Sequence, residues 1–244
     1  MNAICVIPAR YASTRLPGKP LREICGVPMI CRVYERAKLA KSVAEVIVAT
    51  DDERILAAVE KNSGRAVMTR ADHKTGTDRL AEVAEKFPSV DVIVNVQGDE
   101  PLIDAALIDE LVSEFVGDES LQMATVAVEL TDAAEIQNPN NVKVVFDRYH
   151  DALYFSRSQI PYPRNSGVAK TFKHIGIYAY RRDFLLAYAK MEPTPLEQAE
   201  SLEQLRALEN GYKIRVIESN CEFVGVDTEE DLARVNEIYR KAGF

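Results

Sequence analysis

Ala3-Ile4-Cys5-Val6-Ile7 is a continuous apolar run, and Pro8 follows it directly. A run without alternation between apolar and polar residues is typical of a strand buried on both faces of a parallel sheet. Pro8 predicts the end of this strand. A polar loop with several Gly and Pro residues comes next, and apolar residues then recur at helical spacing over residues 28–41. The order of strand, long loop and helix is that of an α/β unit.

The same order repeats along the first half of the chain. Further buried strands are predicted over residues 46–50, 66–68 and 92–96. A helix follows each of them, one capped by Asp51-Asp52, one over residues 77–85 and one over residues 107–115. Strands that alternate with helices pair in parallel through right-handed crossovers. The predicted fold class is therefore α/β, with a mostly parallel, Rossmann-like sheet flanked by helices.

The second half is richer in strands. Strand-like segments with little helix between them lie at residues 123–130, 142–146, 152–155 and 175–180. We expect them to form an antiparallel excursion near residues 142–180, in which the irregular 161–167 loop suits a lid or a partner contact. The chain then predicts a helix over 196–210 that Gly211 ends, a strand over 213–217, and a helix over 228–241 that begins with a capping pattern at Thr228.

Composition limits the class of protein. Of 244 residues, 47% are hydrophobic and 28% charged, which suits a single globular domain over residues 1–244. A net charge of −8 disfavours binding of nucleic acid through its phosphates. The sequence shows neither a membrane-span pattern nor a signal-peptide pattern. The cysteines form no CxxC pair and predict a reducing cytoplasm; they are Cys5, Cys25, Cys31 and Cys221.

Three cations occupy the first loop, whose sequence is Arg10-Tyr11-Ala12-Ser13-Thr14-Arg15-Leu16-Pro17-Gly18-Lys19. The loop leaves the carboxyl end of the first strand, where open α/β sheets bind ligands. Arg10, Arg15 and Lys19 beside small residues suit a polyphosphate, to which backbone N–H groups also donate. A solvated basic loop is the alternative, because the motif is neither a P-loop nor a GxGxxG loop.

Acidic residues follow two other strands. In Val94-Asn95-Val96-Gln97-Gly98-Asp99-Glu100-Pro101 an apolar strand stops at polar residues. Asp99 or Glu100 suits Mg²⁺, which takes one or two protein carboxylates beside waters and phosphate oxygens. Asp227 follows the apolar residues 223–226 and is the best candidate for a second ligand. The alternative role for these acids is in turns or helix capping.

Two more groups of polar residues suit a ligand. Arg70-Ala71-Asp72-His73-Lys74-Thr75-Gly76-Thr77-Asp78-Arg79 lies between a strand and a helix, so its glycine and hydroxyl groups can face the same sheet edge. Capping by Thr75 or Thr77 is the alternative. Arg157 and His174 together suit an anionic polyol, although a lone histidine in a strand is more often structural.

Taken together, these motifs resemble the 3-deoxy-manno-octulosonate cytidylyltransferase family, also called CMP-Kdo synthetases. The resemblance runs in order from Ile4 to about Val235. It is carried by residues 7–20 and 94–101, and by Ala152-Leu153-Tyr154-Phe155-Ser156-Arg157-Ser158, His174-Ile175-Gly176-Ile177-Tyr178, Leu202-Glu203-Gln204-Leu205-Arg206 and Gly225-Val226-Asp227-Thr228. It implies the fold of the nucleotide-diphospho-sugar transferases. It also implies transfer of the cytidylyl group of CTP to the anomeric hydroxyl of 3-deoxy-manno-octulosonate (Kdo), giving CMP-Kdo and pyrophosphate for lipopolysaccharide synthesis.

The resemblance further implies roles for individual residues. Catalytic roles, including charge neutralisation as pyrophosphate leaves, fall to Lys19, Arg10, Arg15 and Asp99. Mg²⁺ is the implied cofactor, with Asp99 and Asp227 as its ligands. The implied nucleotide-binding residues are Ala9, Arg10, Arg15, Lys19, Arg70, Thr75, Gly76 and Thr77, of which Thr75 replaces a serine expected in the family. The implied sugar-binding residues are Gln97, Arg157, His174, Tyr178, Glu203 and Gln204.

Family members are homodimers, so the resemblance implies a homodimer formed through the antiparallel excursion, with CTP and Kdo as substrates and no nucleic-acid or membrane partner. Three alternatives remain: a relative that uses 8-amino-Kdo or a sialic acid, a metal-dependent glycosyltransferase of the same fold, and a non-catalytic nucleotide-binding regulator. Lys19, Asp99 and Asp227 are all present, which favours an enzyme over the regulator.

Overall fold

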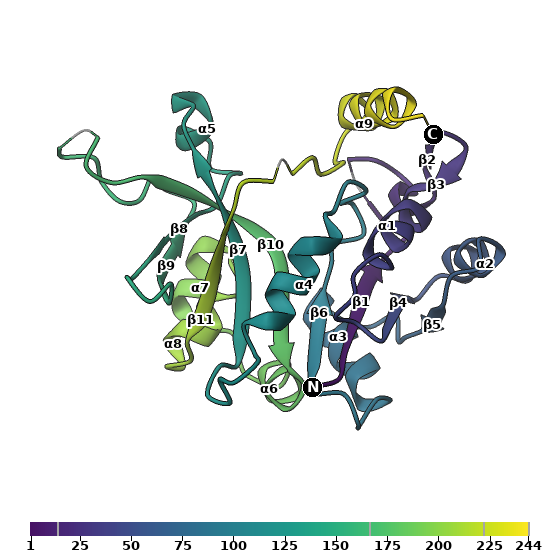
Figure 1. The fold of residues 1–244 in the computed structure, drawn as a ribbon, viewed down its shortest axis with the longest axis horizontal. Helices are drawn as coiled ribbons and strands as arrows, with labels where there is room; N and C mark the ends of the chain where they lie inside the picture. Colours follow the sequence, from purple (N-terminus) through teal and green to yellow (C-terminus); the bar gives the residue numbers. More distant parts are fainter. Residues whose placement is uncertain (14, 166, 222, 244) are drawn as a thin grey trace.

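A computed structural model describes residues 1–13, 15–165, 167–221 and 223–243. Thr14 of the first loop and Ser166 of the 161–167 loop therefore lie outside the described residues. A nine-stranded sheet forms the centre of the described part, in the order β11-β7-β10-β6-β1-β4-β5, and the hairpin β8-β9 branches from β10 (Figure 1).

The first half of the chain builds the parallel part of this sheet. β1 lies between β4 and β6 and is parallel to both, and β5 is parallel to β4. The strands are β1 (Ala3–Ala9), β4 (Glu45–Thr50), β5 (Ala66–Met68) and β6 (Val92–Asn95). β1, β4 and β6 are buried on both faces, as predicted. β5, at the edge of the sheet, is only partly buried, and its Met68 is exposed.

β1 continues past Pro8, so the prediction that Pro8 ends the strand is wrong. Pro8 pairs with Ala49 of β4, whereas the pairing of β1 with β6 ends at Val6 and Asn95. Successive residues of a strand direct their N–H groups to opposite sides. The carbonyl oxygen of Val6 accepts from the N–H of Val96, so the polar backbone groups of Val6 point toward β6. The nitrogen of Pro8 points to the same side, but β6 ends before it reaches Pro8. A proline fits there without removing a ladder hydrogen bond.

The second half adds the antiparallel excursion, which confirms the predicted change of pattern near residues 142–180. β10 is antiparallel to both β6 and β7, and β8 pairs with β10 and β9. β11 returns parallel to β7. The strands are β7 (Met123–Leu130), β8 (Lys143–Phe146), β9 (Ala152–Ser156), β10 (Thr171–Arg181) and β11 (Ile214–Ser219).

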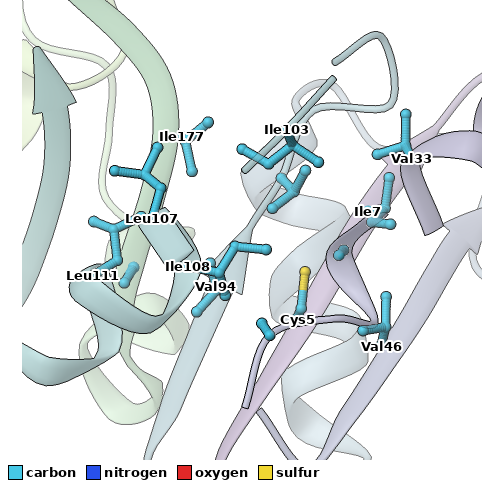
Figure 2. Packing of buried hydrophobic residues seen from close by; sticks show 14 of the residues in the cluster. Cys5, Ile7, Val33, Val46, Val94, Ile103, Leu107, Ile108, Leu111 and Ile177 are labelled. Carbon is cyan, nitrogen blue, oxygen red and sulfur yellow. The ribbon is translucent and has the colours of Figure 1, made fainter. Parts of the chain in front are cut away.

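Helices cover both faces of the sheet, which confirms the α/β class. One face packs on α1 (Met29–Ala37), α2 (Glu53–Lys61) and α4 (Ala105–Ser113). The other packs on α3 (Gly76–Glu85), α6 (Arg182–Tyr188) and α8 (Leu205–Glu209), with α7 (Pro195–Glu200) beside α8. Figure 2 shows Cys5 among the aliphatic side chains of the first face. Burial raises the pKa of its thiol, so Cys5 is a core residue as predicted.

A third apolar cluster joins the first loop to the C-terminal segment. Its members from the N-terminal region surround a short helix, η1 (Lys19–Leu21), and the hairpin of β2 (Glu23–Ile24) and β3 (Val27–Pro28). They pack on the 224–226 segment and on α9 (Glu229–Lys241), beside which the C-terminus lies in Figure 1. The buried members are Leu16, Ile24, Met29, Val224, Val226, Leu232, Val235 and Tyr239.

Several predicted helix boundaries are corrected. The helix predicted over 196–210 is two helices, because Ser201 takes a left-handed conformation with φ of 52° and ends α7. The helix predicted over 28–41 ends at Ala37. α6 was not predicted, nor was the short surface helix α5 (Ala133–Gln137). The C-terminal helix is confirmed, with a capping box between Thr228 and Asp231.

Candidate active site

A cavity of about 370 Å³ lies where β1 and β6 end, and we call it the strand-end cavity. Gly98 brings the segment after β6 against β1, since a Cβ on Gly98 would lie 3.1 Å from the carbonyl oxygen of Pro8. The first loop and the C-terminal segment complete the wall. The lining residues are Pro8, Ala9, Arg10, Ala12, Ser13, Arg15, Lys19, Pro20, Gln97, Gly98, Asp99 and Asp227.

Two carboxylates converge on one ammonium group in this cavity. Nζ of Lys19 lies 2.5 Å from Oδ2 of Asp99 and 2.8 Å from Oδ1 of Asp227. Burial by itself would lower the pKa of Lys19, but the two carboxylates outweigh burial and raise it. Arg15 lies 3.1 Å from the other oxygen of Asp227. The structure thus brings together four of the predicted catalytic and metal-binding residues.

Backbone contacts hold the two aspartates in register. The N–H of Val226 donates to the carbonyl oxygen of Asp99 at 2.9 Å. The N–H of Asp227 donates to Oδ2 of Asp231 in the first turn of α9 at 3.0 Å. The capping box of α9 therefore orients Asp227: Thr228 and Asp231 cap the helix, and Asp227 lines the cavity.

Glu100 lies behind Asp99 and outside the lining of the strand-end cavity. A Cβ on Gly225 would lie 3.2 Å from Oε1 of Glu100, so the carboxylate of Glu100 packs closely on the backbone of Gly225. Burial, and next the charge of Asp99, raises the pKa of Glu100 to about 7. Of the two acids that the sequence offered at this strand end, Asp99 is the one exposed to the cavity.

The pair of aspartates fits a divalent cation that keeps part of its shell for other ligands. Both carboxylates reach a single cationic atom, and their oxygens are the hard donors that Mg²⁺ prefers. No cluster of three or more potential metal ligands occurs among the described residues. A site with two protein carboxylates suits Mg²⁺, which is commonly bound by one or two protein carboxylates together with waters and phosphate oxygens.

Arg10 links the strand-end cavity to the loop before α3. Its guanidinium donates to the carbonyl oxygens of His73 at 2.6 Å and Thr75 at 3.2 Å. The hydroxyl of Thr75 is the N-cap of α3, accepting from the N–H of Asp78 at 3.1 Å. Capping therefore accounts for the Thr75 side chain. Arg70 pairs with Asp72 on the exposed outer side of this loop, at 2.6 Å.

A second cavity, of about 230 Å³, lies behind the sheet edge next to the first turn of α3. We call it the tyrosine cavity, because three tyrosine rings line it. Gln97 lines both cavities, so the two are adjacent. The lining residues are Gly76, Thr77, Asn95, Gln97, Met123, Tyr178, Tyr180, Tyr188, Glu203 and Gln204.

Four of the six predicted sugar-binding residues meet in the tyrosine cavity: Gln97, Tyr178, Glu203 and Gln204. The break between α7 and α8 places the last two there. Oε2 of Glu203 accepts from the hydroxyl of Thr77 at 3.0 Å, and burial raises the pKa of Glu203. Gly76 and Thr77, predicted to bind the nucleotide, also line this cavity.

Arg157 and His174 do not line either cavity. The guanidinium of Arg157 donates to three carbonyl oxygens, among them those of Glu200 at 2.7 Å and Ser201 at 3.3 Å. Nε2 of His174 lies 3.0 Å from Oγ1 of Thr125, and burial lowers the pKa of His174 to about 3. The His174 ring contacts that of Tyr178, with 5.3 Å between centroids. His174 is thus a neutral residue directly behind the tyrosine cavity.

Four lining residues of the tyrosine cavity were not predicted: Asn95, Met123, Tyr180 and Tyr188. The sequence could have pointed to Asn95, because it is a polar residue within an otherwise apolar strand. The two tyrosines had none, since an aromatic residue in a strand or a short helix is typical of any core.

No helix in the described part of the chain is long and apolar enough to span a membrane.

Several known proteins are similar to this chain. Residues 4–214 match the cytidylyltransferase family model. The chain is 55% identical to a 3-deoxy-manno-octulosonate cytidylyltransferase of Geobacter metallireducens, over 97% of each chain, and 54% identical to that of Fusobacterium nucleatum, over 96% of each. A solved structure of CMP:2-keto-3-deoxy-manno-octonic acid synthetase complexed with CTP is 49% identical and superposes with a TM-score of 0.95, covering 99% of this chain and 100% of that one. This chain therefore belongs to the 3-deoxy-manno-octulosonate cytidylyltransferase family.

Proposed function

We propose that this nucleotidyltransferase transfers the cytidylyl group of CTP to the anomeric hydroxyl of Kdo, through the residues that line the strand-end and tyrosine cavities. The observation that carries the residue assignment is the convergence of Asp99 and Asp227 on Lys19, at 2.5 and 2.8 Å, in a cavity that also contains Arg10 and Arg15. A cavity suited to a sugar adjoins it at Gln97. The product CMP-Kdo serves lipopolysaccharide synthesis.

The reaction is a displacement at phosphorus. The anomeric oxygen of Kdo forms a bond to the α-phosphorus of CTP, the bond from that phosphorus to the bridging oxygen of pyrophosphate breaks, and the hydroxyl proton is lost to solvent. Lys19, Arg10 and Arg15 bind the triphosphate and stabilise the negative charge that grows on pyrophosphate. The chain itself need supply only positioning and charge, because the attacking group belongs to the substrate.

Mg²⁺ is the cofactor that we propose for this site, with Asp99 and Asp227 as its protein ligands. When bound, it would supply positive charge to the phosphate oxygens and help to align the two substrates. Lys19 contacts both carboxylates and also lines the strand-end cavity, where its ammonium group would bind the triphosphate.

The two cavities divide the substrates between them. We assign the nucleotide to Ala9, Arg10, Arg15 and Lys19 of the strand-end cavity, together with Arg70 and the Thr75, Gly76 and Thr77 turn that Arg10 contacts. We assign the sugar acid to Gln97, Tyr178, Glu203 and Gln204, with Arg157 or His174 close to its carboxylate. Those two lie outside the lining, so direct contact requires them to turn toward the sugar.

We also propose that residues 1–244 act as one domain in a cytoplasmic homodimer that the 142–180 excursion forms. Four exposed large apolar side chains gather within residues 149–168, where Leu153 is 62% exposed; the others are Tyr149, Tyr162 and Val168. All four cysteines are free thiols, which suits a reducing compartment. Light scattering of the wild type and of Leu153→Asp tests the dimer. A monomeric wild type would overturn it.

Pyrophosphate release tests the reaction. We expect purified protein with CTP, Mg²⁺ and Kdo to release pyrophosphate, and little release with ATP, GTP or UTP. 8-Amino-Kdo and N-acetylneuraminate test the choice of sugar acid. Release with one of these and not with Kdo would move the sugar assignment and keep the cytidylyl transfer. Silence with every pair of substrates would overturn the proposal.

A further inference from the structure

Three buried polar atoms in the tyrosine cavity have no hydrogen-bond partner among the described residues. They are Oδ1 of Asn95, Oε1 of Glu203 and Nε2 of Gln204. All three residues line the same cavity of about 230 Å³. Oε1 of Glu203 lies 3.8 Å from the guanidinium of Arg206, which is beyond hydrogen-bond distance.

Unsatisfied polar atoms in such a place are costly for the folded protein. Asn95 and Gln204 are each only 5% exposed. A buried donor or acceptor without a partner loses its hydrogen bonds to water and gains none in return, so native proteins keep few of them. Three that meet in one cavity indicate a polar ligand that supplies the missing partners.

The three atoms define the chemistry of that ligand. Two of them are acceptors and one is a donor. A carboxylate fits poorly, because it cannot donate and because Glu203 would repel it. An ammonium group cannot accept from Gln204. Hydroxyl groups both donate and accept, so neighbouring hydroxyls of a polyol satisfy all three atoms at once.

The tyrosine rings support the same ligand class. The rings of Tyr178 and Tyr180 are stacked at 5.7 Å between centroids, and those of Tyr180 and Tyr188 at 6.3 Å. The hydroxyl of Tyr188 is committed to the carbonyl oxygen of Glu203, at 2.6 Å. Aromatic surface between polar groups suits a molecule that has both C–H faces and hydroxyl edges, as a sugar does.

We propose that Asn95 is a specificity-determining residue of the sugar subsite, where its Oδ1 accepts a hydrogen bond from one hydroxyl of the sugar acid. Glu203 and Gln204 pair with the same hydroxyl or its neighbour. This inference rests on the proposed function. It also orients the substrate: the anomeric carbon, which carries the carboxylate, stays toward Gln97 and the strand-end cavity, and the hydroxyls remote from it enter the tyrosine cavity.

A substrate and enzyme double-mutant cycle tests the contact. The probes are Kdo and its monodeoxy analogues, each lacking one hydroxyl remote from the anomeric carbon. We expect Asn95→Ala to lose about tenfold in kcat/KM for Kdo, with KM for CTP unchanged. With the wild type, one analogue should have a kcat/KM about tenfold below that of Kdo. With Asn95→Ala, that analogue and Kdo should have the same kcat/KM, since the variant already lacks the contact.

Matched variants distinguish this contact from a general loss of packing. Ser42→Ala removes another buried oxygen that has no partner among the described residues and lies outside both cavities, and it should leave the kinetics unchanged. Asn95→Asp keeps an acceptor oxygen, so with this variant the analogue that lacks the contacted hydroxyl should again have a lower kcat/KM than Kdo. If Asn95→Ala does not fold, Asn95→Ser, whose hydroxyl is too short to reach, takes its place.

The outcomes separate the two proposals. If the wild type does not turn over CTP and Kdo, the proposed function fails. If the wild type turns over CTP and Kdo, but the ratio of kcat/KM between Kdo and each analogue is the same for the wild type and for Asn95→Ala, only the assignment of Asn95 is overturned. An unchanged kcat/KM for Kdo in Asn95→Ala would overturn it equally.

Discussion

Lys19 and Asp99 form an ion pair in the strand-end cavity, with 2.5 Å between Nζ and Oδ2. The same ammonium group contacts Asp227 at 2.8 Å, so Lys19 pairs with both proposed metal ligands. The lysine and a divalent cation therefore compete for the same two carboxylates. The triphosphate offers Lys19 another anion, so binding of CTP and of the metal should favour each other.

Replacement of Lys19 by methionine should separate catalysis from metal binding. We expect Lys19→Met to lose at least about 100-fold in kcat, because a cation at the leaving pyrophosphate is removed. Without CTP, the variant should bind Mn²⁺ about tenfold more tightly than the wild type, since the competing charge is gone. Titration followed by the Mn²⁺ paramagnetic resonance signal measures this affinity. The exposed Lys38→Met is the control, and weaker Mn²⁺ binding by Lys19→Met would contradict the competition.

Loss of one proposed metal ligand should stop turnover without unfolding the chain. We expect Asp99→Asn to reduce kcat at least about 100-fold at saturating CTP and Kdo, with the thermal midpoint within a few degrees of the wild type. Asp99 is half-buried and pairs with Lys19, so its amide isostere fits the same space. The exposed Asp183→Asn serves as the control. A wild-type rate with Mg²⁺ in Asp99→Asn would sink the assignment.

Glu82 should make the loop before α3 sensitive to acid. Burial opposes its ionisation, but the N–H of Arg70 and the side chains of His73 and Lys86 lower its pKa from 4.5 to about 2. A carboxyl whose pKa is lower in the folded state stabilises the fold above its unfolded pKa and loses that effect as the pH falls. The contribution, at most about 3 kcal/mol, is therefore present above pH 4.5 and disappears toward pH 2.

The Glu82→Gln variant tests this linkage. We expect a lower free energy of unfolding at pH 7 and a shallower loss of stability between pH 4.5 and 2 than in the wild type. KM for CTP should rise several-fold, because Glu82 also contacts His73, at 2.6 Å, whose carbonyl oxygen holds Arg10. Denaturant unfolding across this pH range measures the effect. Glu85→Gln, on the exposed side of the same helix, is the control; identical pH profiles for Glu82→Gln and the wild type would refute the argument.

Glu200 should act on the sugar through Arg157. Its carboxylate accepts from the hydroxyl of Ser156 at 2.7 Å and from the N–H of Arg157 at 2.9 Å, and its carbonyl oxygen accepts from the Arg157 side chain. Lys143, which is fully buried, holds the same turn by donating to the carbonyl oxygen of Arg157 at 2.5 Å. These contacts fix the path of the chain between β9 and the 201–204 segment.

We expect Glu200→Ala to raise KM for Kdo about tenfold and to leave KM for CTP unchanged, because only the sugar side of the site loses its support. Steady-state kinetics with each substrate varied in turn measures the split. The exposed Glu192→Ala is the matched control. An equal rise in both KM values would show that Glu200 supports the fold as a whole and not the sugar side.

Residues near the active site show how far sequence reasoning reached. Arg10, Arg15, Lys19, Asp99 and Asp227 were found because cations in a loop and acids at strand ends are local patterns, and the family resemblance implied that the two aspartates share a metal ion. Asn95 was overlooked because one polar residue in an apolar strand does not reveal whether its side chain has a partner. Glu203 and Gln204 were named, but the predicted helix over 196–210 hid the turn that directs them into the cavity.

The sequence by itself determined the alternation of strands and helices, the antiparallel excursion and the cap of the last helix, because apolar periodicity and capping are interactions between near neighbours in the chain. Only the tertiary structure decided which acid meets which cation. Lys19 and Asp227 are 208 residues apart and meet because the apolar cluster of Leu16, Val224 and Val226 packs the first loop on the C-terminal segment. Such contacts depend on how whole elements bury their apolar surface together, and that is a property of the folded chain.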